Sequence, residues 1–343
     1  MAPVSTTELA SLTTLRLGGP ARRLVEATTA DAVVDAVRAA DAAGEPLLVL
    51  GGGSNVVVDD AGWPGTVVHI VTTGMGAERR PDGSVLLTVE AGEDWDGVVA
   101  ATVEQGLGGL ECLSGIPGRT GATPVQNVGA YGVEIADLLV DVDLYDRRTG
   151  TVREHVPAAD LGLGYRTSTL KGRDDAVVLR VRFALPGDGS SAPVRYPELA
   201  RALGVEPGER VPAAAAREAV LALRRGKGMV LDDEDRDTWS AGSFFTNPIV
   251  DAAQAPEGAP RWPAGEQVKL PAAWLIQHAG FARGHAGPGG RVALSGKHVL
   301  ALTHRGGGSA EDLLVLAREV RDVVRATFGV DLVPEPVLVG CRL

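Results

Sequence analysis

Apolar residues recur along this chain at two spacings, which predicts a mixture of helices and strands. In the segment 29–43 they follow the helical period, with a Thr at its start and Gly44 after its end. A Thr cap and a terminal Gly are typical helix boundaries, so we expect a helix there. The same pattern predicts helices at 94–105, 211–225 and 309–328, the last of them with Ser309 as its N-cap.

Shorter apolar or alternating runs predict strands at 46–50, 56–58, 66–71, 85–89, 138–145, 151–155, 176–185 and 332–339. The segment Arg147-Arg148-Thr149-Gly150 separates two of these runs and is typical of a hairpin turn. Two stretches lack either period. We interpret 186–193 (PGDGSSAP) as a flexible connector and the Ala- and Pro-rich 251–267 as an exposed loop.

Length and composition narrow the class of protein. A chain of 343 residues is long enough for two or three domains, and 45% hydrophobic with 22% charged residues indicates a globular protein. A net charge of −11 offers no basic stripe, so we expect no nucleic-acid partner. The acidic segment 232–237 is interpreted as a solvated loop.

The two cysteines, the N-terminal segment and the length of the apolar runs indicate whether the protein binds metal and where in the cell it is located. Cys112 and Cys341 lie far apart and lack the spacing of a zinc site, so we interpret both as buried thiols and expect no metal. The start, Met1-Ala2-Pro3-Val4-Ser5, lacks the basic and apolar regions of a signal peptide. No apolar run approaches the length of a membrane span. We therefore expect a cytoplasmic protein that binds no membrane.

Two glycine-rich segments carry the first candidate chemistry. The segment 113–132 (LSGIPGRTGATPVQNVGAYG) has Arg119 as its sole charge, and Leu50-Gly51-Gly52-Gly53-Ser54-Asn55 follows a predicted strand. Glycine lets the backbone approach a ligand, and unpaired N–H groups there can hold a phosphate. The pattern is not GxGxxG and no long helix follows it, which argues against a Rossmann site. Either segment alone could be a packed structural loop; together they favour a nucleotide or cofactor site.

The second half supplies candidate reactive groups. Ser243 lies in the run GSFFTNP (242–248), and the segment 162–171 places Tyr165 and Arg166 in a loop. Lys227 and Lys269 stand out because the chain has four lysines among its 33 cations, and Lys offers a point charge on a flexible stem. Each has a structural alternative: a turn hydroxyl, a surface salt bridge or a solvated lysine.

Considered together, these motifs resemble one family over nearly the whole chain, from 13 to 340. The matching pieces are GGGSN (51–55), GIPG (115–118), PVQNVGAYG (124–132), GYR (164–166), AGSFF (241–245), NP (247–248), KLPAAWLI (269–276) and PE (334–335). The chain resembles UDP-N-acetylenolpyruvoylglucosamine reductase, a flavoenzyme of bacterial cell-wall synthesis. The Tyr196 loop (RYPEL) is similar to that of the subtype whose mobile tyrosine loop closes on the substrate.

The resemblance implies an α+β fold: a two-subdomain FAD-binding fold of the vanillyl-alcohol-oxidase type, plus a third substrate-binding α/β domain. It places the first FAD-binding subdomain at 1–72 with 326–343, the second at 73–226 and the substrate-binding domain at 227–325. Because 51–60 contains neither His nor Cys, we expect non-covalent FAD. The implied cofactor-binding residues are Gly51, Gly52, Gly53, Ser54, Asn55, Gly115, Ile116, Pro117, Gly118, Thr120, Gly121, Ala122, Gln126, Asn127, Gly129, Ala130 and Tyr131.

The resemblance also implies a reaction. NADPH reduces the flavin, and hydride then passes to the enolpyruvyl ether of UDP-N-acetylglucosamine enolpyruvate, giving UDP-N-acetylmuramate. The implied catalytic residues are Arg166 and Glu335, which flank the substrate carboxylate, and Ser243, the general acid. The implied substrate-binding residues are Tyr165, Tyr196, Lys227, Asn247 and Lys269.

Some positions depart from the family pattern. Thr246 replaces a frequent Lys, the segment after Lys227 lacks the usual proline, and Pro336 follows Glu335. Two other functions stay open: an FAD-dependent alcohol oxidase of the same flavin fold, and a non-catalytic protein that binds flavin or a UDP-sugar. An oxidase would consume oxygen and would not need the motif around Ser243. We expect a monomer.

Overall fold

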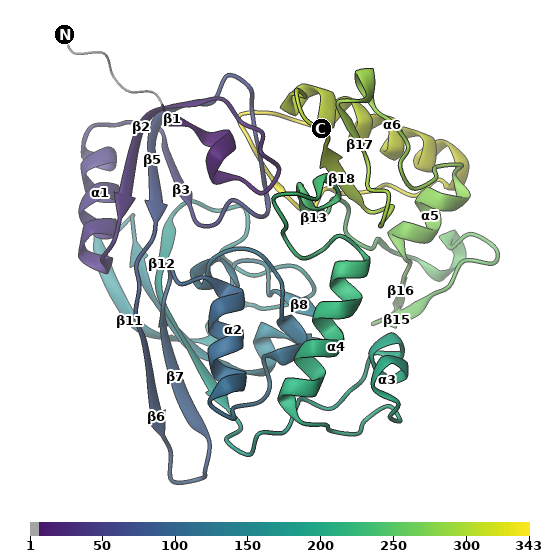
Figure 1. The fold of residues 1–343 in the computed structure, drawn as a ribbon. Helices are drawn as coiled ribbons and strands as arrows, with labels where there is room; N and C mark the ends of the chain where they lie inside the picture. Colours follow the sequence, from purple (N-terminus) through teal and green to yellow (C-terminus); the bar gives the residue numbers. More distant parts are fainter. Residues whose placement is uncertain (1–6) are drawn as a thin grey trace. The chain divides into compact units, whose positions relative to one another are not determined.

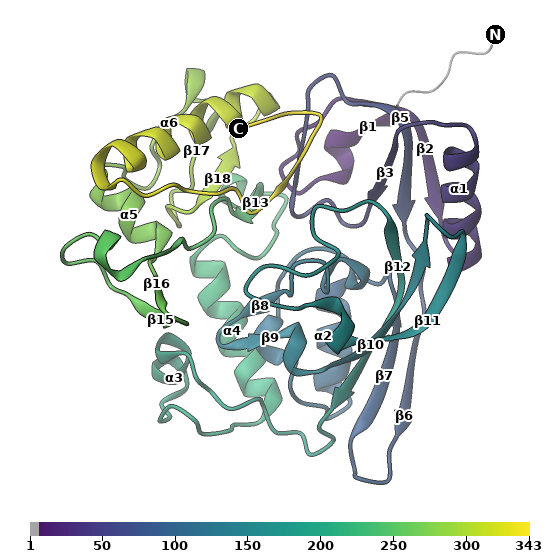
Figure 2. The ribbon, with the colours of Figure 1, turned by 180° about the vertical axis from the view of Figure 1, so that it is seen from behind.

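The computed structural model describes residues 7–343, so the start of the chain, where no signal peptide is expected, lies outside the described residues. The chain divides into two compact units, each drawn in Figures 1 and 2. Unit 1 comprises Met1–Ala21, Gly53–Trp63 and Lys227–Leu343; unit 2 comprises Arg22–Gly52 and Pro64–Gly226. The three-part division inferred from the resemblance stays a prediction.

Unit 2 contains a five-stranded antiparallel sheet, in the order β11-β10-β12-β7-β6 (Figure 2). These strands are β6 (Met75–Arg79), β7 (Val85–Glu90), β10 (Leu139–Asp146), β11 (Thr151–Pro157) and β12 (Ala176–Leu185). Helix α2 (Trp95–Glu104) packs its apolar face on this sheet, with the Trp95 and Phe183 rings 5.8 Å apart. The predicted hairpin at 147–150 joins β10 to β11.

A second sheet of unit 2 contains β2, β5 and β3 in that order, with β3 and β5 parallel. Their bounds are β2 (Pro20–Ala27), β3 (Leu47–Leu50) and β5 (Trp63–Ile70). Helix α1 (Ala30–Ala42) lies beside β2 in Figure 1 and buries Val33, Val34 and Val37. The side chain of Thr29 accepts a hydrogen bond from the amide of Ala32, as expected of an N-cap.

The rest of unit 2 connects these layers. Its other elements are η2 (Glu111–Leu113), η3 (Thr120–Ala122), β8 (Gly129–Ala130), β9 (Val133–Glu134), η4 (Ile135–Asp137), η5 (Ala158–Leu161), α3 (Pro197–Leu203) and α4 (Ala213–Gly226). Helix α4 begins directly after Pro212 and buries Ala213, Ala216, Val220 and Leu221 along one face.

Unit 1 has a three-stranded antiparallel sheet, β13-β18-β17, built from β13 (Ser240–Ser243), β17 (Val292–Leu294) and β18 (Ala301–His304). Helices α5 (Ala272–His278) and α6 (Ala310–Phe328) share its apolar core. Ser309 and Asp312 form a capping box at the start of α6. The predicted N-cap is therefore confirmed.

The remaining elements of unit 1 are shorter. They are β1 (Thr7–Glu8), η1 (Leu9–Leu12), β4 (Val56–Val58), η6 (Arg236–Thr238), β14 (Ile249–Val250), η7 (Ala252–Gln254), β15 (Trp262–Ala264), β16 (Gln267–Lys269), η8 (Pro288–Gly290) and β19 (Val337–Val339). Strands β14, β16 and β15 form a small antiparallel sheet, and β19 pairs with β4 in parallel.

Three sequence interpretations are corrected. The strand expected at 332–339 is confined to β19, because only its last residues pair with β4. The stretch 251–267 is not all loop, since β15 pairs with β16. The segment 186–193 is no flexible connector. Ser191 is fully buried and donates its amide to the carbonyl of Val211, while the carbonyl of Pro186 accepts from Gly108.

Both cysteines are free thiols. Cys112 is fully buried, as expected, and burial raises its pKa to about 12. Cys341 is only half-buried, and burial raises its pKa to about 11. Among the described residues, no helix combines the length and the apolar character that crossing a membrane requires.

Candidate functional site

Gly51 and Gly52, the part of the first glycine-rich segment that belongs to unit 2, meet the second segment within that unit. A side chain on Gly52 would place its Cβ 2.7 Å from the Cα of Gly118, and one on Gly51 would lie 3.4 Å from the Cβ of Arg119. The backbones therefore pack directly on each other, and no residue larger than Gly fits at 52 without movement. The left-handed φ of the first loop belongs to Gly53, at +58°, where a side chain would meet the carbonyl of Leu12.

The first glycine loop leaves consecutive amides unused. Within residues 7–343, the backbone N–H groups of Gly52, Gly53 and Ser54 have no hydrogen-bond acceptor. Consecutive unpaired N–H groups at the end of a strand form a concavity that suits an anion. The carbonyl of Asn55, the next residue, accepts a hydrogen bond of 2.9 Å from the amide of Val337.

Arg119 is a residue whose role the sequence reasoning did not assign. Its guanidinium forms no ion pair or hydrogen bond in the described part of the chain. It lies within the second segment, against Gly51 and Gly52 of the first. The pKa of buried His69 is lowered mainly by its burial and, to a smaller extent, by the positive charge of nearby Arg119. The sequence contains one clue to a role for Arg119, since it is the sole charged residue between 113 and 132.

The rest of the 113–132 segment is held by short contacts. The amide of Gly115 donates to Asp96 at 2.6 Å, and its carbonyl accepts from Arg224 at 3.3 Å. Ile116 and Pro117 are half-buried, Thr120 and Gly121 are buried, and Ala122 is exposed. The Thr120 and Gly121 amides donate to the carbonyls of Glu93 and Ala91. These bonds fix the loop against the start of α2.

Arg224 is a second charged residue that the sequence motifs do not single out. It lies in the last turn of α4, and burial lowers the pKa of its guanidinium to about 10. The negative charges of Tyr131, once it ionises, and of Asp96 oppose this lowering of the Arg224 pKa. No spacing rule separates this arginine from its neighbours Arg225 and Arg217 on the same helix.

The polar residues at the end of the segment differ in their surroundings. Buried Asn127 donates its amide to Glu134 and to the Gly164 carbonyl, and accepts from the Ala136 amide. These partners favour a positioning role for Asn127. Gln126 and Ala130 are half-buried.

Arg166 is held against the 113–132 segment of unit 2. It has a left-handed φ of +53°, and its guanidinium donates to the carbonyl of Gly129 at 2.6 Å. The same group lies 5.3 Å from the centre of the Tyr165 ring. Lys171 donates to the Arg166 carbonyl, which helps to hold this unusual backbone conformation. The structure thus fixes Arg166 and Tyr165 against the glycine-rich segment.

Tyr196 lies near the segment as well. It is 45% exposed, precedes α3, and its ring meets that of Tyr131 edge-on at 5.5 Å. Burial raises the pKa of Tyr131 to about 12. An exposed aromatic ring at the start of a short helix can cover a bound ligand.

In unit 1, the segments that carry Ser243 and Glu335 lie side by side. Ser243 ends β13, and the Phe244 carbonyl that follows accepts a hydrogen bond of 2.8 Å from the amide of Glu335. Buried Phe245 forms a bridge with Pro334, which fixes the two segments side by side. The side chain of Asn55 donates to the Glu335 carbonyl at 3.4 Å. This arrangement unites residues separated by about 280 positions.

Asn247 and Lys269 form a second group in unit 1. The Asn247 side chain accepts from the amide of Ala272 at 2.9 Å, next to the start of α5. Lys269 lies in β16 and pairs with Ile249 of β14, so it is adjacent to the Asn247 segment. Lys227, the first residue of unit 1 after α4, is half-buried. Arg166 belongs to unit 2, so its meeting with Ser243 and Glu335 is part of the proposed function.

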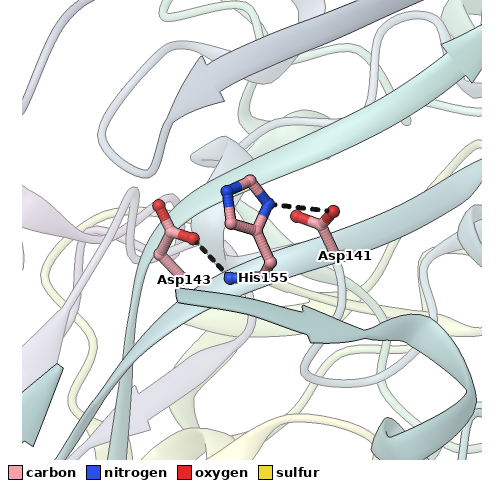
Figure 3. Close-up of side chains that lie close together, drawn as sticks. All are labelled: Asp141, Asp143 and His155. Carbon is pink, nitrogen blue, oxygen red and sulfur yellow. Dashed lines mark hydrogen bonds and ion pairs between the residues drawn. The ribbon is translucent and has the colours of Figure 1, made fainter. Parts of the chain in front are cut away.

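Asp141, Asp143 and His155 have the composition of a metal site, with potential ligand atoms within 4.8 Å of one another (Figure 3). The carboxylates are nevertheless already engaged: Arg182 donates to both, and Arg180 donates to Asp143. Two guanidinium groups at the carboxylates disfavour a cation there. The geometry supports an ion-pair network across the sheet.

Comparisons with known proteins agree with this geometry. Residues 233–339 match the family described as UDP-N-acetylenolpyruvoylglucosamine reductase, C-terminal domain, and residues 21–155 match an FAD binding domain. The reductase of Saccharopolyspora erythraea is 64% identical, over 99% of this chain and 97% of that protein. The chain belongs to the UDP-N-acetylenolpyruvoylglucosamine reductase family.

Other members of the reductase family give the same result. The protein of Nocardia farcinica is 58% identical over 98% of this chain and 89% of its own length. The crystal structure of the reductase from Thermus caldophilus has a TM-score of 0.68 and 25% identity, and the likeness covers 98% of each chain. The α+β fold, with an FAD-binding part of the vanillyl-alcohol-oxidase type and a C-terminal domain, is confirmed.

The residues present fit an FAD of the reductase family. Three consecutive unpaired amides, at Gly52, Gly53 and Ser54, suit a pyrophosphate. Arg119 lies against Gly51 and Gly52, so it supplies a cation near the first of these amides. The individual contacts of FAD stay predictions.

Proposed function

We propose that this chain uses NADPH to reduce the enolpyruvyl ether of UDP-N-acetylglucosamine enolpyruvate, forming UDP-N-acetylmuramate for peptidoglycan synthesis. Its membership of the reductase family makes it an FAD-dependent oxidoreductase. The observation that carries the proposal is the pairing of the Ser243 and Glu335 segments through the Phe244 carbonyl. A protein that merely bound flavin or a UDP-sugar would have no need for a general acid beside a carboxylate.

The glycine loops would hold the cofactor. The amides of Gly52, Gly53 and Ser54 would bind the FAD pyrophosphate, and Gly115, Gly118 and Tyr131 belong to the second wall. FAD, when bound, accepts hydride from NADPH and donates it to the substrate. The protein contributes binding, orientation and exclusion of water.

Three side chains would act on the substrate. Arg166 would bind the substrate carboxylate with two N–H groups, which stabilises the negative charge that develops there. Its bond to the Gly129 carbonyl and its contact with Tyr165 hold the guanidinium in place. Glu335 would hydrogen-bond the same group in its protonated form. Ser243 would donate a proton to the adjacent carbon.

Substrate recognition would use the remaining predicted residues. Lys269 and Lys227 would contact the diphosphate as point charges, and Asn247 lies beside the Lys269 strand. Tyr196, exposed and in contact with Tyr131, supports the subtype in which a tyrosine loop closes on the substrate. Tyr165 would line the site beside Arg166.

A visible spectrum of the purified protein tests the proposal. We expect the absorbance of oxidised flavin, anaerobic bleaching by NADPH, and recovery of the absorbance when the enolpyruvyl substrate is added. An alcohol oxidase would instead be reduced by an alcohol and reoxidised by oxygen. A binding protein would show flavin that NADPH does not bleach.

Further proposals concern the state of the protein. We propose a cytoplasmic monomer that interacts with neither nucleic acid nor membrane. The acidic net charge of −11 supports the first of these exclusions. Light scattering checks the monomer, for which a mass of 35.4 kDa is expected.

A further inference from the structure

A groove in unit 1 lies outside the residues assigned above. It has a volume of about 540 Å³ and an apolar floor that includes Leu332, Val333, Pro334 and Leu338. The groove is shallow and largely open to solvent, so a molecule bound there would keep part of its surface exposed. Val333 is 59% exposed, which is high for a large apolar side chain.

The rim of the groove is positive. It carries Arg321, Arg325 and Arg342 against a single acidic lining residue, Asp331. Arg325 is paired with Asp331, and Arg321 with Asp322. Arg342 is exposed, and its guanidinium makes no ion pair with any described residue. Two of the three arginines are thus already neutralised, and Arg342 beside the apolar floor is complementary to a single anionic group.

The floor is also part of the segment that carries Glu335. The Val333 carbonyl accepts a hydrogen bond of 3.0 Å from the amide of Thr246, and Pro334 forms a bridge with Phe245. The next residue is Glu335, bonded to the Phe244 carbonyl. A molecule in the groove would therefore contact the peptide that holds Glu335 near Ser243.

We propose that this groove binds an amphipathic organic anion, with an apolar body on the floor and one carboxylate or phosphate at Arg342. Occupancy restrains residues 332–335 and slows reoxidation of the flavin by the enolpyruvyl substrate. This second part rests on the proposed function, whereas the binding does not. Reduction by NADPH does not use Glu335 and is unaffected.

Calorimetry on the FAD-loaded protein tests the binding. The probes are decanoate and decyl phosphate, which distinguish the two anionic head groups, with decyltrimethylammonium and inorganic phosphate as controls for charge and for the apolar body. At least one amphipathic anion binds with a stoichiometry of one, and neither control binds in the same concentration range. Failure of both anions to bind overturns the proposal.

Two variants locate the site. Arg342→Glu weakens binding by at least about tenfold, the loss expected for one charge-assisted contact. Val333→Asp does the same, and its exposure makes it compatible with folding. Arg283→Glu, a charge reversal at an exposed arginine outside the groove, leaves binding unchanged. Equal binding in all three variants places the anion elsewhere and contradicts the proposal.

Rapid mixing separates the two parts of the inference. Saturating anion slows reoxidation by about fivefold or more, a typical coupling between two sites, and Arg342→Glu abolishes this effect. If the anion binds while reoxidation is unchanged, binding in the groove is confirmed and the proposed effect on Glu335 is wrong. If substrate never reoxidises the flavin, the proposed function fails, while calorimetry still decides the groove.

Discussion

Ser243 provides the sharpest test at the scale of single residues. Ser243→Ala removes one hydroxyl from the end of β13, so FAD binding and reduction by NADPH should be preserved. Reoxidation by the enolpyruvyl substrate should slow about 10²–10⁴-fold, the effect typical of a lost general acid. Rapid-mixing absorbance measures the two half-reactions separately.

Two further variants control that measurement. Ser243→Cys should recover part of the rate, because a thiol can also donate a proton. Ser84→Ala, in the turn between β6 and β7, should change neither half-reaction. Reoxidation of Ser243→Ala at the wild-type rate would mean that the proton comes from another group.

Lys269 is expected to act in binding. Lys269→Met removes a charge and keeps most of the apolar stem, so KM for the UDP-sugar should rise about 10–100-fold. Reduction of the flavin by NADPH should change less. Lys297→Met is the matched control in unit 1, because Lys297 is paired with Asp235 and has no assigned role.

Steady-state and rapid-mixing kinetics of both lysine variants give the answer. Equal loss of the two half-reactions in Lys269→Met would assign Lys269 to the fold or to a site shared with NADPH. A KM raised equally in Lys297→Met would mean that the effect is not specific to position 269.

At the scale of elements, the contact between the glycine loops explains why position 52 requires Gly. Gly52→Val would drive its side chain into the Gly118 backbone, so FAD occupancy should fall even though Gly52 does not supply the left-handed φ. Gly76→Val on β6 is the control, since a Cβ there has no atom within 4 Å. Flavin absorbance relative to protein absorbance reports occupancy. Full occupancy in Gly52→Val would show that the loops can separate without losing the cofactor.

The ion pairs across β10 and β12 should stabilise unit 2. The Asp143 side chain is 3% exposed and Arg182 is 9% exposed, and removing one partner of a buried pair costs about 3–5 kcal/mol. Burial by itself raises the pKa of Asp143, but hydrogen bonds from Arg182 and His155, with the nearby Arg charges, lower it overall. Asp143→Asn should therefore lower the free energy of unfolding.

The pH dependence of that loss follows from the sign of the shift. A lowered pKa in the folded state stabilises the protein at neutral pH, and this contribution disappears as the pH falls through the folded-state pKa. The difference between wild type and Asp143→Asn should be largest near pH 7 and should shrink below about pH 4. Denaturant titrations across this range measure it. Asp322→Asn, at an exposed pair, should lower the free energy of unfolding far less than Asp143→Asn does.

Local signals located the helices well. Thr29 before α1 and the capping box of α6 have partners within one turn of the chain, so the sequence alone contains them. The paired glycine loops and the Ser243 motif were also recognisable as candidates. Strand pairings were less accessible: β15 requires β16, and β19 requires β4 from far earlier in the chain.

The site was predictable only where its residues belong to contiguous motifs. Arg119 and Arg224 were missed as functional candidates because one contacts a loop distant in sequence and the other is enclosed by tertiary packing. Asn127 was predicted to bind the cofactor, and that contact stays a prediction. Its three bonds to Glu134, Gly164 and Ala136 arise only in the folded chain.

At the scale of the whole molecule, net charge should govern how reactants approach. The chain carries −11, and NADPH is itself an anion, so long-range repulsion should slow their encounter at low ionic strength. The second-order rate constant for flavin reduction should rise between low and physiological salt, because screening shortens the range of repulsion to about 8 Å. Stopped-flow measurements over a salt series check this. A rate constant that falls with salt would show that local cations outweigh the net charge.

Cys112 and Cys341 differ in burial, so Cys341 alone offers a thiol that a chemical label can reach. Cys112 is shielded on every side, whereas Cys341 lines the groove with part of its surface open. A maleimide dye should therefore attach at Cys341 first, and slowly, because its raised pKa leaves little thiolate at neutral pH. No cysteine need be added or removed to place a fluorophore at the edge of the groove. The speed of that labelling reaction would itself record how often the groove is covered.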